Sequence, residues 1–171
     1  LSAKLKCCIG MLGLLLTEIP GGGLYAQKPV SETLQVNKCN DFSIDGKGTN
    51  PEWRKTSWHL LTRLDSAGIN YASRFKILYG AKGIYVLFDG KDNRISTDFH
   101  EDFQDLYNAD VFEVFFQPDT SMPLYLEYEI NALNKELVLL IPNLSGRASG
   151  WLPFHYNMKS VQKKVAVVGG K

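Results

Sequence analysis

The sequence predicts an all-β protein, an antiparallel, jelly-roll-like β-sandwich. Beyond residue 30 the apolar residues recur mainly with a period of two, which is the period of a β-strand and not of a helix. Short apolar runs are separated by turns rich in Gly, Pro, Asn and Asp. Several short strands joined by turns are typical of two sheets packed face to face.

The N-terminal residues have the pattern of a secretory signal peptide. Lys4 and Lys6 precede an apolar run over residues 7–16, and Leu-Tyr-Ala ends at Ala26 as a small-residue cleavage site. A run of about ten residues is too short for a bilayer, which needs roughly 20 helical residues, although a retained anchor is the alternative. We expect residues 1–26 to be removed and residues 27–171 to form one secreted domain, located in the periplasm, outside the cell or on its surface.

The first predicted elements are loops over residues 40–53 and then a hairpin. The hairpin strands are Arg74–Tyr79 and Ile84–Asp89, because a connection of four residues with two glycines joins two alternating runs. The segment 89–108 is acidic and lacks a steady period, so it is either a functional loop or a short helix around residues 102–107.

The later strands follow the same alternation. They are expected at Asp110–Gln117, Leu124–Asn131, Lys135–Ile141 and Val161–Val168, with the second and third of these forming another hairpin. The chain ends directly after the last predicted strand. We therefore expect the sandwich to be truncated, with its C-terminal strands missing.

Composition excludes several kinds of partner. Lys and Arg number 19 and Asp and Glu 18, so no basic face is available for a nucleic acid. Cys39 is the one cysteine beyond residue 26, so no internal disulfide is expected, and no Cys or His spacing matches a zinc site. We expect a monomer that has no membrane partner after cleavage of the signal peptide.

Two groups of carboxylates are candidates for chemistry. Glu127 and Glu129 share one strand face at roughly 6–7 Å, which fits a solvated face, a polar sugar-binding surface or a glycosidase acid/base pair. Asp110 and Glu113 face opposite sides. The acidic segment carries oxygen ligands that suit Ca²⁺, with a simple solvated loop as the alternative; these residues are Asp89, Asp92, Asn93, Asp98, Asp102 and Asp105.

Aromatic residues in loops or on polar faces are candidates for stacking on a sugar ring. Tyr107, Tyr125 and Trp151 are of this kind, and Tyr125 shares its strand face with Glu127, Glu129 and Asn131. A sugar site combines an aromatic ring against the C–H face of the sugar with polar side chains that bind its hydroxyls. Core packing is the alternative role for each ring.

The order of several segments resembles the family 9 carbohydrate-binding modules, in the divergent form of secreted bacterial proteins, from about Phe42 to Gly169. The segments that carry the resemblance are Ile44–Lys47 with Pro51–Trp53, Phe75–Tyr79 with Gly83–Asp89, Asp110–Phe115, and Tyr128–Asn131.

This resemblance implies a sandwich that binds a sugar between two aromatic rings. Tyr107 then falls near the first stacking position, Glu113 on the sugar-binding glutamate, and Asn131 in the strand that lines the site. Glu129 stands where the best-known members carry an arginine. Related sandwich domains bind haem through Met and His, and Met122, Met158 and His100 keep that alternative open.

The predicted function is non-catalytic binding of a polysaccharide or oligosaccharide, such as xylan or cellulose, within a secreted polysaccharide-degrading system. The candidate sugar-binding residues are Tyr107, Glu113, Tyr125, Glu129, Asn131 and Trp151. No cofactor is required by the sequence, which leaves calcium open as one. Two alternatives remain: a glycosidase-associated domain with its own activity through Glu127 and Glu129, and a cell-surface structural or interaction domain whose sugar site is lost.

Overall fold

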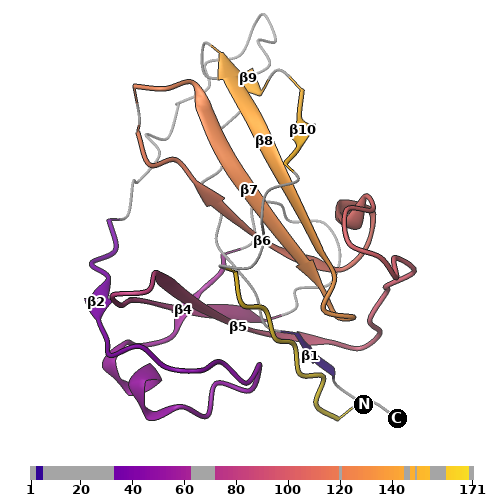
Figure 1. Ribbon diagram of the computed structural model, residues 1–171. Coiled ribbons are helices and arrows are strands. Elements are labelled where there is room, and N and C mark those ends of the chain that lie inside the picture. The colour runs from indigo at the N-terminus through magenta and orange to yellow at the C-terminus, as the bar shows by residue number, and fades with distance from the viewer. Residues whose placement is uncertain are drawn as a thin grey trace, which may run out of the picture.

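The computed structural model describes residues 3–5, 33–62, 72–119, 121–144, 147–148, 150–154 and 161–169. The described chain forms two β-sheets that lie one over the other with their strands crossing (Figure 1). The only helical elements in these ranges are two short 3₁₀-helices, η1 (Pro51–Lys55) and η2 (Leu106–Asn108). The predicted β-sandwich class is therefore confirmed.

The first sheet has the strand order β1-β5-β4-β2, with β3 also paired to β4. Its strands are β1 (Ala3–Leu5), β2 (Asn37–Lys38), β3 (His59–Leu60), β4 (Ser73–Tyr79) and β5 (Ile84–Asp92). The β4–β5 hairpin is the one predicted, although β5 continues three residues further than expected. Its turn is closed by the amide of Gly80, which donates to the carbonyl of Gly83 at 2.8 Å.

The second sheet has the strand order β10-β8-β7-β6, with β9 also paired to β8. Its strands are β6 (Val111–Phe116), β7 (Leu124–Asn131), β8 (Glu136–Leu144), β9 (Arg147–Ala148) and β10 (Leu152–Pro153). The strands β6, β7 and β8 are consecutive antiparallel neighbours. The predicted strand over Leu124–Asn131 and the hairpin that follows it are confirmed.

Three apolar clusters cover the faces of the two sheets. Phe75, Phe88 and Ile130 pack between the sheets. Trp53 of η1 packs with Leu78 and Leu87 on the outer face of the first sheet. A third cluster lies on the outer face of the second sheet and contains Leu106, Leu137, Leu139 and Ile141. Each sheet is therefore covered on both faces, which explains why residues 136–139 of β8 are buried without alternation.

This covering corrects the expectation of a solvated polar face on β7. Glu129 and Asn131 are both fully buried, with 0% of their surface exposed. The segment that covers them is 99–107, whose Phe99, Phe103 and Leu106 pack against β8. The predicted alternation along β7 is confirmed, but the end of the strand at Glu129–Asn131 is buried on both faces, whereas Leu124–Tyr128 are half-buried.

The strand predicted at Val161–Val168 is wrong. Residues 161–169 are described, but they join no sheet ladder there and run as extended chain past β5, drawn in yellow (Figure 1). Val165 packs against the cluster between the sheets. The Lys163 ammonium lies 2.8 Å from the Asp102 carboxylate and 3.1 Å from that of Glu136. Side-chain contacts therefore hold this segment in the place of backbone pairing.

The predicted signal peptide lies outside the described residues, apart from the backbone of β1, which pairs with the end of β5. Its removal and the secretion of the domain stay predictions. Within the described ranges no helix is long and apolar enough to cross a membrane.

Candidate functional site

Strand pairing brings three glutamates together on the outer face of the second sheet. Glu113 of β6 lies directly opposite Glu129 of β7. Glu127 lies two residues earlier in β7 and so points to the same face. One carboxylate oxygen from each of the three lies within 4.8 Å of the others. We call Glu113, Glu127 and Glu129 the carboxylate cluster.

The surroundings of the carboxylate cluster are apolar and acidic. On β8 the residues opposite Glu127 and Glu129 are Leu139 and Leu137, both buried. Glu113 and Glu127 are half-buried, whereas Glu129 is fully buried. Among the described residues no N–H, hydroxyl or cationic group donates to the carboxylate oxygens of Glu129. Its hydrogen-bond partner is the carboxyl group of Glu127, which requires a proton between the two.

Burial raises the pKa values of all three carboxyl groups. The pKa of Glu129 rises to about 8, first because of desolvation and then because of the charges of Glu113, Glu127 and Asp105. The pKa of Glu127 rises to about 7 for the same main reason, with Glu113 as the second cause. Desolvation also raises the pKa of Glu113. At neutral pH the cluster therefore keeps at least one proton unless a cation joins it.

Two exposed aromatic rings pair with each other, and one of them, Tyr107, lies within electrostatic reach of the carboxylate cluster. Tyr107 in η2 is 40% exposed and Trp151, just before β10, is 46% exposed. Their ring centroids lie 6.3 Å apart with an angle of 63° between the ring planes. Partial desolvation, Asp105 and the charge of Glu129 raise the pKa of Tyr107, which places this phenol within electrostatic reach of the cluster.

Tyr125 lies further along the same face. It is half-buried, belongs to the apolar cluster under segment 99–107, and its ring lies 5.7 Å from that of Phe115. Phe115 was not among the sequence candidates. It shares a face with Glu113 by its spacing of two residues in β6, so the strand period could have identified it.

Asn131 serves the protein's own structure. Its side-chain amide donates to the carbonyl of Phe99 at 2.8 Å, and its side-chain oxygen accepts from the amides of Leu133 and Lys135, each at 3.0 Å. These bonds hold the β7–β8 turn and segment 99–107 together. Because the side chain is buried, its predicted contact with a sugar stays a prediction that these bonds do not favour.

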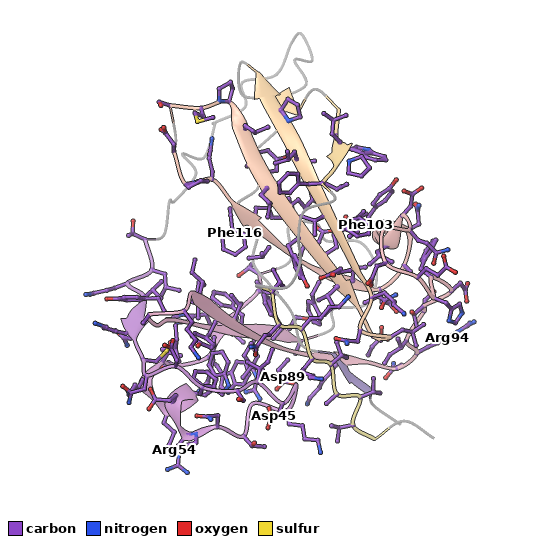
Figure 2. All side chains as sticks on the ribbon, viewed as in Figure 1. Asp45, Arg54, Asp89, Arg94, Phe103 and Phe116 are labelled. Carbon is purple, nitrogen blue, oxygen red and sulfur yellow. The ribbon has the colours of Figure 1, made fainter. Side chains whose placement is uncertain are left out.

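The acidic residues predicted as calcium ligands are dispersed. Asp89 in the first sheet pairs with Arg74 at 2.7 Å, whereas Asp102 accepts the amide of Glu136 in β8 at 3.0 Å and pairs with Lys163. Figure 2 shows Asp89 well apart from Phe103, the residue that follows Asp102. Asp92 accepts the amide of Arg94. Among the described residues the carboxylate cluster is the group whose oxygens are close enough to share a metal ion.

The haem alternative and a cavity concern other parts of the chain. Met158 lies outside the described residues, so the haem alternative stays untested. A cavity of about 510 Å³ opens between the sheets, lined by inward-facing residues such as Val114, Leu126 and Ile130. It lies on the opposite face of the second sheet from the carboxylate cluster.

Comparison with known proteins identifies the family. A family model described as carbohydrate family 9 binding domain-like matches residues 44–140. The match covers more than half of the chain and includes Tyr107 and the carboxylate cluster, but not Trp151. No curated protein and no solved structure matches the chain. The chain belongs to the carbohydrate family 9 binding domain-like family, a family of non-catalytic modules whose ligand is a carbohydrate.

Proposed function

We propose that this chain is a non-catalytic module that binds a polysaccharide or oligosaccharide on the outer face of its second sheet. A sugar ring stacks on Tyr107 and Trp151, and its hydroxyls bind the half-buried carboxylates of Glu113 and Glu127. We also propose that the domain is exported from the cytoplasm, because polysaccharides such as xylan and cellulose are found outside the cell.

The exposed aromatic pair is the observation that carries this proposal. Large aromatic side chains usually bury most of their surface, so two neighbouring exposed rings beside polar groups are typical of a ligand site. Tyr107 and Trp151 come from segments far apart in the sequence and meet at 6.3 Å. A domain that had lost its sugar site would be expected to bury Tyr107, which instead is 40% exposed.

Titration calorimetry with xylan, cellulose and mannan oligosaccharides tests the proposal. We expect saturable binding to one of them, with a loss of at least tenfold in affinity in both Tyr107→Ala and Trp151→Ala. Tyr79→Ala is the matched control, because Tyr79 is 43% exposed but belongs to the first sheet. Equal losses in all three variants would contradict the proposed location, and an absence of binding across the panel would contradict the function.

The same samples test the rival glycosidase activity. The carboxyl groups of Glu127 and Glu129 have pKa values that suit acid/base chemistry near neutral pH, which is the observation that favours this rival. A non-catalytic module releases no new reducing ends from any of these sugars. Release that disappears in Glu127→Gln would replace the proposed function with hydrolysis.

A further inference from the structure

Glu129 is too deeply buried to contact a sugar directly, so the proposed function leaves it without a role. Its side chain is 0% exposed. A buried carboxylate is strongly destabilising unless it is paired, hydrogen-bonded or bound to a metal ion, and otherwise it takes up a proton and becomes neutral. A fully buried glutamate beside two other glutamates therefore requires an explanation.

The other two buried acids in the described ranges each have a cationic partner. Asp89 pairs with Arg74 at 2.7 Å. Glu136 accepts the hydroxyl of Tyr128 at 2.6 Å and lies 3.1 Å from the ammonium of Lys163. Glu129 differs from both, because no cation and no N–H or hydroxyl donor among the described residues reaches its carboxylate oxygens. Its hydrogen-bond partner is another acid, Glu127, and the charges that act on it are acidic.

The geometry of the carboxylate cluster suits one calcium ion. Calcium binds carboxylate oxygens at about 2.3–2.6 Å, so two oxygens on opposite sides of the ion lie up to about 5 Å apart. The three oxygens lie within 4.8 Å of one another. An all-carboxylate set selects a hard cation, whereas zinc sites usually include His or Cys.

We propose that Glu113, Glu127 and Glu129 bind a calcium ion on the outer face of the second sheet. The ion supplies the positive charge that Arg74 and Lys163 supply to the other buried acids. Three carboxylates provide three to six of the six to eight oxygen ligands that calcium takes. Water completes the shell on the side of the half-buried Glu113 and Glu127. Calcium binding requires no sugar, although it uses Glu113 and Glu127, the two carboxylates to which the proposed function assigns the sugar hydroxyls.

Calcium binding to the full chain, freed of divalent ions with EDTA, tests this proposal at pH 8 without any sugar. We expect calcium to raise the melting temperature and to bind with saturation in calorimetry. Terbium should replace calcium and luminesce when Tyr107, the aromatic residue within electrostatic reach of Glu129, is excited. Glu129→Gln should lose at least tenfold in affinity for calcium and most of the terbium signal.

The variants separate loss of the site from loss of the fold. In the absence of calcium, Glu129→Gln should melt at or above the temperature of the native chain, because it removes a buried charge. Glu127→Gln is a second test with the same expected loss of affinity, and Glu101→Gln, an exposed residue of segment 99–107, should bind normally. Failure of the native chain to bind calcium or terbium at millimolar concentration, or unchanged binding in both glutamate variants, would overturn the proposal.

Discussion

At the scale of single residues, the carboxylate cluster links stability to pH. A carboxyl group whose pKa is higher in the folded than in the unfolded chain binds more protons when folded. Its contribution to stability is therefore complete at acid pH and is lost as the pH rises through the folded value. The ordinary pKa of 4.5 rises to about 7 for Glu127 and about 8 for Glu129.

The free energy of unfolding, measured by urea denaturation in EDTA, should therefore fall between about pH 5 and pH 8.5. Each unit of pKa shift corresponds to about 1.4 kcal/mol. Because the two groups titrate as a coupled pair and Glu127 is partly exposed to water, we expect the fall to be well below the sum of the two shifts, on the order of a few kcal/mol. The double variant Glu127→Gln/Glu129→Gln should largely abolish it. A stability that rises over this range, or a fall that persists in the double variant, would be inconsistent with shared burial of these groups.

The sequence identified most of the residues on this face but not their environment. Tyr107, Trp151, Glu113 and Glu129 could be selected because aromatic and acidic residues lie at polar or loop positions. Burial of Glu129 depends on segment 99–107, which has no period of its own and so could not be placed. The meeting of Glu113 with Glu129 depends on the register of β6 against β7.

At the scale of elements, the turn between β7 and β8 positions the segment that carries the first stacking residue. Asn131 bonds two amides of the turn and the carbonyl of Phe99. The amide of Phe103 donates to the carbonyl of Glu136 at 2.8 Å, which fixes the segment a second time. Tyr107 follows this anchored stretch, so its orientation depends on contacts that it does not make itself.

Asn131→Ala should therefore lower the free energy of unfolding by about 2 kcal/mol, because two part-buried amides and a carbonyl lose their partner. It should also weaken sugar binding, since segment 99–107 loses its anchor to β7. Asn108→Ala, an exposed asparagine in η2, is the control and should change stability by less than about 0.5 kcal/mol. Equal stability of the two variants in urea denaturation would contradict the structural role given to Asn131.

Alternation predicted the central strands well because each of them pairs on both sides or forms a hairpin. The same pattern failed for residues 161–168, where Val165 packs against the core without a partner strand. A valine-rich segment has a high strand propensity and can bury its side chains whether or not it pairs with another strand. Its sequence therefore does not reveal whether a β-ladder forms.

At the scale of the whole molecule, the C-terminal segment closes over the loop that begins the matched family region. A Cβ atom at Gly46 would lie 2.9 Å from the backbone carbonyl carbon of Val165, and Gly46 has a φ of +71°. Both observations require glycine at this position. The backbone of residues 164–166 therefore packs against the loop at Gly46. Lys163 of the same segment forms ion pairs with Asp102 and with Glu136 of the second sheet.

Gly46→Ala should lower the free energy of unfolding by about 2–4 kcal/mol, from left-handed backbone strain and from the displaced segment. Gly150→Ala isolates the strain alone, since Gly150 has a φ of +97° and open space around its Cβ position. In thermal denaturation, the melting temperature of Gly46→Ala should therefore be well below that of Gly150→Ala. A similar loss in both would show that the contact with Val165 contributes nothing.

A backbone-amide NMR titration of the chain with an oligosaccharide that binds would locate the sugar site directly. We expect shift changes at residues 105–107, 113, 127–129 and 151, on the outer face of the second sheet, with the amides of β4 and β5 unchanged. Shift changes confined to the first sheet, or to residues that line the cavity between the sheets, would contradict this location.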